Sequence, residues 1–373
     1  MIRKITATAL AGAAALSTSG CLKSESKTSI NSDGSGKFSM TMEMNIAGIM
    51  GLVGAAAGGG AAPADMPKGP EAKEMLAQLM RGMNANVDVW TEAKAETTKM
   101  GALKVSVAGL TKDWTAMGDM SSLLSDSGLG EGSPLPVPTD ALKDFKSVRV
   151  SKDSAGNTVI AMAGLDEMAS MLDGVRKSML GVEGAPGPEG IDISRDEIAA
   201  QMTGFREQYQ SMKGVLALFI KDMKVSTTIE TGGTIVEAVG FKKSEDGKSA
   251  TWTMNGEQLM DVVDSIINDE DMPDKAAELI KTVTTNLDND KSTEAIKKFL
   301  APYVKEMLGG TTSPRLVIKD AGNSFDYAAE VEKAKAAQSP ALKALVEKAS
   351  RKSSVKLPGA SPAEADDDAK EVK

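Results

Sequence analysis

The chain has 373 residues, of which 43 are basic and 52 acidic, and it carries a formal charge of −9. One cysteine and no histidine occur in it, which excludes Ser-His-Asp and Cys-His catalysis and leaves zinc with carboxylate ligands alone. The acidic balance makes nucleic acid and anionic lipid surfaces poor partners.

The first twenty residues have the layout of an export signal. Two basic residues precede an apolar run from Ile5 to Leu16, and small polar residues follow up to Gly20. The apolar run is too short to span a bilayer. We therefore expect residues 1–20 to be a signal peptide, whose removal changes the formal charge from −9 to −11.

The end of this signal resembles the lipobox of bacterial lipoproteins at Ser19, Gly20 and Cys21. In that family the signal is cut just before the cysteine, whose sulfur carries lipid, and acyl chains such as palmitate anchor the protein. Lipoboxes usually have leucine where this chain has Thr18, and the Ser17-x-Ser19 pair could instead serve an ordinary signal peptidase. Because the chain offers the thiol no disulfide partner, we predict that Cys21 is the lipid attachment site.

The lipoprotein resemblance implies a location in the cell envelope, with the membrane as a partner through the lipid anchor. Leu22 stands where an aspartate often marks inner-membrane retention in this family, which favours the outer membrane in a cell that has one. We expect residues 21–27 to form a lipidated tether that reaches about 25 Å at most. The folded part should therefore lie close to the membrane.

Alternating apolar and polar residues from Lys37 to Ile46 predict a half-buried strand. The turn residues NSDGSG precede it, so we expect a β-hairpin over Ser26–Ile46.

Two features of this hairpin invite a ligand-binding interpretation. The DGSGK stretch lacks the spacing of a phosphate loop and is followed by a strand, which favours a plain turn. Met40, Met42 and Met44 share one face, where thioethers could hold Cu(I), but the alternation favours a core role for them.

The remaining pattern predicts strands, mostly in antiparallel hairpins, and separate amphipathic helices. Strands are expected within 87–97, 103–110, 148–160, 225–230, 236–252 and 316–319, and helices at 75–83, 165–180, 205–223, 259–267, 276–283 and 296–308. Gly- and Pro-rich stretches at 51–70, 127–140 and 181–190 are expected to be loops. We thus predict an α+β envelope domain over residues 28–338, with a curved sheet packed against helices, then a short helix and a disordered tail over 339–373.

Two acidic clusters are candidates for carboxylate chemistry, NDED at 268–271 and DND at 288–290. Both stand directly before predicted helices, where capping and the helix dipole explain them. Neither fits the calcium-loop pattern. We therefore assign no catalytic, metal or cofactor residue to them.

Three features of this chain together resemble the LppM-type domain of bacterial lipoproteins. They are the cysteine at the lipid-attachment position, the early DGSG hairpin, and the segment VSTTIETGGTIVEAVGFKKSEDGKSATWTM. We expect no C-terminal membrane helix of the kind that such proteins carry. The resemblance implies a curved sheet with an apolar hollow for lipid.

Together these features predict a membrane-anchored, non-enzymatic envelope lipoprotein without cofactor or metal, which binds an apolar ligand or an envelope protein. One alternative is a carboxylate-dependent hydrolase of the cell surface. Another is a structural or assembly role, in which a sheet edge or the loops bind another envelope protein. An acidic pair facing one cleft would favour the hydrolase, and a dry cavity lined by methionines would favour the ligand binder.

Overall fold

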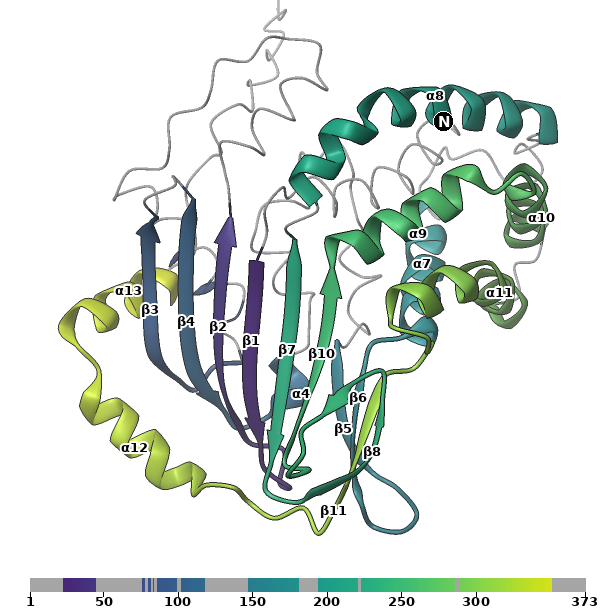
Figure 1. Cartoon of the computed structure of the whole chain (residues 1–373). Helices are drawn as coiled ribbons and strands as arrows, with labels where there is room; N and C mark the ends of the chain where they lie inside the picture. The colour runs from purple at the N-terminus through teal and green to yellow at the C-terminus, as the bar shows by residue number, and fades with distance from the viewer. Residues whose placement is uncertain are drawn as a thin grey trace, which may run out of the picture.

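The computed structural model describes residues 23–44, 76–77, 80–81, 83, 86–98, 102–117, 147–180, 194–220, 223–285 and 289–350. These residues form two β-sheets with helices packed beside them, which confirms the expected α+β class (Figure 1). The signal, Cys21, the tail after Ser350 and the stretches at 51–70, 127–140 and 181–190 lie outside the described residues.

The strands are β1 (Lys23–Ile30), β2 (Gly36–Met44), β3 (Val89–Thr97), β4 (Leu103–Thr111), β5 (Val148–Lys152), β6 (Thr158–Met162), β7 (Lys224–Thr231), β8 (Thr234–Val239), β9 (Lys242–Lys243), β10 (Ser249–Asn255) and β11 (Arg315–Lys319). The helices are α4 (Trp114–Met117), α7 (Leu165–Leu180), α8 (Arg195–Ile220), α9 (Gly256–Asn268), α10 (Met272–Thr285), α11 (Asn289–Met307), α12 (Tyr327–Ala337) and α13 (Pro340–Ser350). The described residues between 76 and 83 are also helical, as expected there.

The large sheet has seven strands in the order β3-β4-β2-β1-β7-β10-β9. Its neighbouring strands are antiparallel except β1 and β7, which run parallel with Lys23 opposite Lys224. This parallel pair joins the first hairpin to a segment about 200 residues later in the chain. A second sheet, in the order β5-β6-β11-β8, lies beside one end of the large sheet (Figure 1).

Strand β1 begins at Lys23, whereas the sequence predicts a start near residue 28 and a tether before it. The strand has no apolar alternation in its first half, because Ser24 and Ser26 take the inward-facing positions beside Met42 and Met40. Most of the expected tether thus belongs to the sheet.

The turn between β1 and β2 is the plain hairpin turn that the sequence predicts. The backbone N–H of Asn31 donates to the carbonyl oxygen of Ser35 at 2.8 Å. The Asp33 carboxylate accepts hydrogen bonds from the N–H and the hydroxyl of Ser35. Gly34 has a φ of +86°, a conformation that other residues adopt at a cost.

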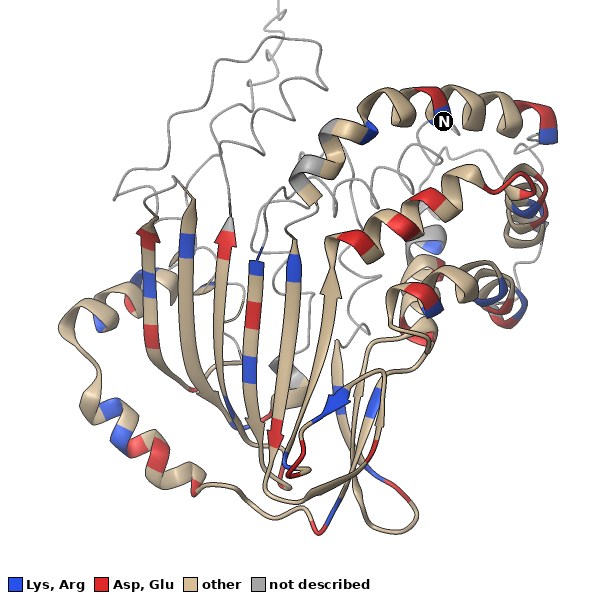
Figure 2. Cartoon of the chain, in the orientation of Figure 1, with Lys and Arg blue, Asp and Glu red and all other residues tan. Residues whose placement is uncertain are grey.

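The two faces of the large sheet differ in polarity. On β1 all three charged residues, Lys23, Glu25 and Lys27, share the outer face, where Lys27 forms an ion pair with Glu230 of β7 at 2.9 Å. Figure 2 shows charges spread over β1, β3 and β7, while β10 carries none. One face of this sheet is therefore exposed to solvent, as is common in antiparallel sheets.

Three buried clusters hold the described elements together. The first lies between the two sheets and α11, with Ile229, Trp252, Ile160, Leu316 and Val304 among its members. The second lies on β2, β3 and β4, against the helical residues near 80 and α13. It lies on the face of the sheet opposite the charged one, which is called the inner face here. The third joins α8 to α10. The short helix expected after residue 338 is present as α13, and its residues Leu342, Leu345, Val346 and Ala349 belong to or pack against the second cluster.

Candidate functional site

The inner face of the large sheet forms three rows of side chains across four strands, β2, β1, β7 and β10 in that order. The strand registers place the members of each row directly opposite one another. The first row, nearest the start of β1, is Met42, Ser24, Val225 and Met254; the second is Met40, Ser26, Thr227 and Trp252; the third is Phe38, Thr28, Ile229 and Ala250.

Exposure rises along the strands from the third row to the first. Every side chain of the third row is buried, with Thr28 and Ile229 each 2% exposed. In the second row Trp252 is buried and the other three are half-buried, and in the first row all four are half-buried. The inner face is thus closed where the second sheet packs on it and more open where β1 begins.

The rows combine apolar flanks with a strip of hydroxyls. The methionines lie on the outer two strands, β2 and β10, while serine and threonine occupy β1 and β7. The Ser26 hydroxyl donates to Thr227 Oγ1 at 2.9 Å, so these two hydroxyls satisfy each other. Methionine side chains are flexible and adapt to the shape of what they contact.

The twelve positions of the three rows include no acidic or basic residue. A general acid or base would therefore have to come from elsewhere, so the face suits binding rather than proton transfer. The alternation in the sequence predicts that Met40, Met42 and Met44 face the core. The structure confirms this for Met40 and Met42, and the side chain of Met44 lies outside the described residues.

The acidic cluster at 268–271 lies where α9 ends and directly before α10, as the sequence predicts. Asp269 ends α9, and its carboxylate accepts hydrogen bonds from the N–H of Asp271 at 2.9 Å and from Lys275 Nζ at 2.6 Å. Tyr303 of α11 donates to the same carboxylate at 3.2 Å. In the second cluster, Asp290 lies in the first turn of α11, whereas Asp288 lies outside the described residues.

Burial opposes ionisation of Asp269, but the hydrogen bonds from Lys275, Asp271 and Tyr303 outweigh it and lower the pKa of this carboxyl. Burial and the adjacent Asp269 carboxylate raise the pKa of Tyr303 to about 12. Asp269 is therefore a charged link between three helices. Within the described ranges, no group of three or more Cys, Asp or Glu side chains is arranged to hold a metal ion.

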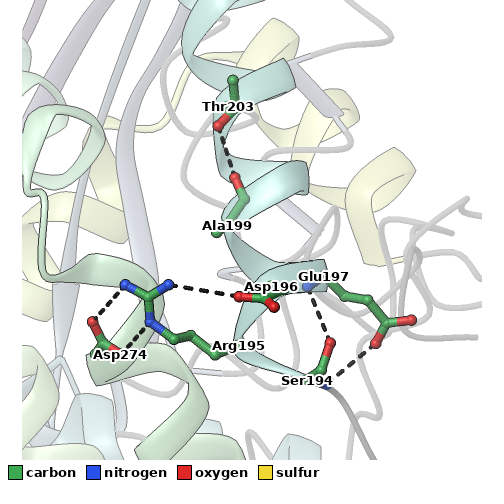
Figure 3. Close-up of polar contacts among 7 residues, drawn as sticks. All are labelled: Ser194, Arg195, Asp196, Glu197, Ala199, Thr203 and Asp274. Atoms are coloured by element: carbon green, nitrogen blue, oxygen red, sulfur yellow. Dashed lines mark hydrogen bonds and ion pairs between the residues drawn. The ribbon is translucent and has the colours of Figure 1, made fainter.

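Close-range polar contacts also fix the start of α8, which begins about ten residues before the expected helix at 205 (Figure 3). The Ser194 hydroxyl accepts from the Glu197 N–H, and the Glu197 carboxylate accepts from the Ser194 N–H, both at 3.2 Å. Arg195 donates through Nε and Nη2 to both oxygens of Asp274 in α10. These contacts attach α8 to α10 and leave no ligand-facing group among them.

The sequence did not predict that Ser24, Ser26 and Met254 lie in these rows. The alternation of apolar and polar residues in SATWTM, within β10, could have predicted that Trp252 and Met254 share one face of a strand. The polar first half of β1 gave no such signal, because its inward positions are serines.

Cys21, the predicted attachment site, precedes the first described residue by two positions. In the part of the chain that the structure covers, no helix has both the length and the apolar character to cross a membrane.

No protein-family model and no curated protein matched this chain. Among solved structures, it is similar to the NMR structure of the folded domain of the Mycobacterium tuberculosis LppM protein, with 9% sequence identity and a TM-score of 0.26. The match covers 64% of this chain and 84% of that one. This weak likeness concerns the fold alone.

Proposed function

We propose that this chain is a membrane-anchored envelope lipoprotein without enzymatic activity, which binds an apolar ligand on the inner face of its large sheet. The observation that supports this proposal best is the graded exposure of the three inner rows. A sheet face that only served the core would be buried along its whole length, whereas the first row, with Met42 and Met254 at its ends, is half-buried.

The position of β1 relates this face to the proposed anchor. Two peptide steps separate Cys21 from Lys23, a reach of about 7 Å at most. With lipid on Cys21, the end of the sheet that carries the first row lies next to the bilayer. An apolar ligand could then pass between the membrane and the inner face without crossing much water.

The residues of the rows suggest the ligand's chemistry. The methionine thioethers and the Val225 side chain favour a flexible hydrocarbon, and the Ser24 hydroxyl can donate a hydrogen bond to a carboxyl or ester group. The absence of charge from the twelve row positions disfavours a ligand that is ionic along its length. We therefore favour a fatty acyl chain with one polar end.

The ligand is tested with a dansyl-labelled fatty acid added to the purified, delipidated protein. We expect saturable binding by the wild type and at least a tenfold weaker affinity for Met42→Asp, because a carboxylate on the first row must lose its hydration when the chain binds. Ser39→Asp is the matched control, since this exposed residue belongs to the same strand but to its outer face.

Circular dichroism must show that both variants are folded. No binding by the wild type would contradict the ligand, and an equal loss in Ser39→Asp would contradict the inner face as its site. Neither result would bear on the lipid anchor. No binding by the wild type would favour the role in which the sheet edge or the loops bind an envelope protein.

A further inference from the structure

The last two helices run along one edge of the large sheet, and residues Tyr327–Ser350 are called the strap here. The segment before the strap is fixed to the first hairpin turn, where Asn31 accepts from the N–H of Ser324 at 2.9 Å and donates to the carbonyl of Phe325 at 3.2 Å. From there α12 and α13 follow edge strand β3 (Figure 1). The N-terminal end of the strap is thus held to the hairpin turn by hydrogen bonds, and its helices lie against the edge of the sheet.

Helix α12 is held mainly near its ends. None of its residues is buried. Tyr327, its first residue, donates to the carboxylate of Asp88, and Gln338, just after its last residue, donates to the carbonyl of Trp90 at 2.8 Å. Little apolar surface therefore opposes its separation from the sheet.

Helix α13 binds through one apolar stripe. Leu342 and Ala349 are buried, and Leu345 and Val346 are partly buried, a spacing of i, i+3, i+4 and i+7. This is the spacing by which amphipathic helices occupy apolar surfaces on partner proteins. Eleven residues are too few for a stable isolated helix in water, so α13 depends on this contact for its structure.

Helix α13 packs into the second buried cluster, of which Leu342 and Ala349 are themselves members. The surface under α13 is formed by the rest of that cluster, the buried side chains of the sheet and of the helical residues near 80, namely Phe38, Leu76, Met80, Val87, Trp90, Leu103, Val105 and Val107. Arg81 donates to the carbonyl oxygen of Ala349 at 3.3 Å, close to the end of the stripe. The surface therefore offers apolar contact along α13 and a cationic donor at its C-terminal end, which favours a helix in this orientation.

We propose that α13 is a displaceable occupant of this surface, and that a partner's amphipathic helix with the same apolar spacing binds there when the strap opens. Opening breaks the contacts of α12 and the stripe of α13, whereas the two sheets keep their strand pairing and the core between them. This proposal does not depend on the lipid anchor or on the proposed ligand.

Hydrogen exchange of the full-length wild type tests the opening. We expect the amides of α13 to exchange together and at least ten times faster than those of β2 and β4, because the strap opens while the sheet stays paired. Equal protection of α13 and β4 would show that the strap unfolds only with the whole protein and would overturn the proposal.

The free surface is tested with a fluorescent peptide of residues 339–350. We expect this peptide to bind full-length Leu342→Asp, in which a carboxylate prevents α13 from docking, at least ten times more tightly than the wild type. Lys343→Asp, an exposed change on the same helix, should behave as the wild type. If Leu342→Asp is folded but does not bind the peptide, or if it loses its sheet signal in circular dichroism, the surface is not a separable helix site and the proposal is wrong.

Discussion

At the scale of single residues, two carboxylates in the helical part of the protein have structural partners. Asp264 of α9 accepts from Tyr209 at 2.8 Å and from Lys213 at 2.7 Å, both in α8. Asp269 accepts from Lys275 and Tyr303 in the same manner. Each carboxylate thus links helices that are separate in the sequence. For the cluster at 268–271 the sequence favoured helix capping and the helix dipole over catalysis, and it did not predict this link.

Substitution of Asp269 by asparagine should lower the free energy of unfolding by about 1–2 kcal/mol at pH 7, because a charged acceptor of three hydrogen bonds is lost. The folded-state pKa of Asp269 lies below its ordinary value of 3.8. Its contribution is therefore fully present above that value and is lost as the pH falls through the folded-state pKa.

Urea unfolding of the wild type and of Asp269→Asn, from pH 7 down to about pH 2, measures this dependence. The difference between the two proteins should disappear at the acid end. Glu270→Gln is the control, because this neighbouring residue is exposed. A difference that persists unchanged at the acid end would mean that the charge of Asp269 is not what stabilises the fold.

At the scale of elements, local patterns in the sequence predicted most of the strands and helices. Strand β2 and the turn before it follow from alternation and from NSDGSG, and α11 follows from its apolar stripe. Helix α12 was not expected, because it has no buried face and so no apolar periodicity. The parallel pairing of β1 with β7 was not expected either, since hydrogen bonds between such distant segments leave no mark in local composition.

The junction of α8 with α9 depends on a residue whose role only the structure reveals. Gly256, the first residue of α9, lies so close to the end of α8 that an added Cβ would be 1.6 Å from the carbonyl oxygen of Ile220. A backbone atom cannot rotate away as a side chain can. The two helices must therefore separate if any side chain is placed there.

Gly256→Ala should destabilise the protein by at least about 3 kcal/mol, the upper part of the range for overpacking. Gly204→Ala offers the opposite case, because nothing lies within 4 Å of its Cβ position in the middle of α8, and alanine should stabilise that helix by about 0.5–1 kcal/mol. Thermal unfolding of both variants gives the comparison. Equal effects of the two changes would contradict the close approach at Gly256.

At the scale of the whole molecule, the sheet presents a charged outer face to solvent and an inner face that is buried at one end and half-open at the other. The sequence predicted the apolar side of β2, because alternation is a property of a single strand. It did not predict the rows across β1, β7 and β10, since the registers arise from tertiary pairing. Both the proposed ligand site and the proposed anchor are assigned to the end of the sheet where β1 begins.

Mass spectrometry of the protein extracted from membranes with detergent tests the lipid anchor most directly. Full digestion with trypsin should give an N-terminal peptide of Cys21, Leu22 and Lys23 whose mass exceeds that of the unmodified tripeptide by a thioether-linked diacylglyceryl group. A Cys21→Ser variant, made in the same cells, should leave the membrane fraction and lack that mass. Recovery of the wild-type peptide with a free thiol, or of a mature chain that begins elsewhere, would contradict the account.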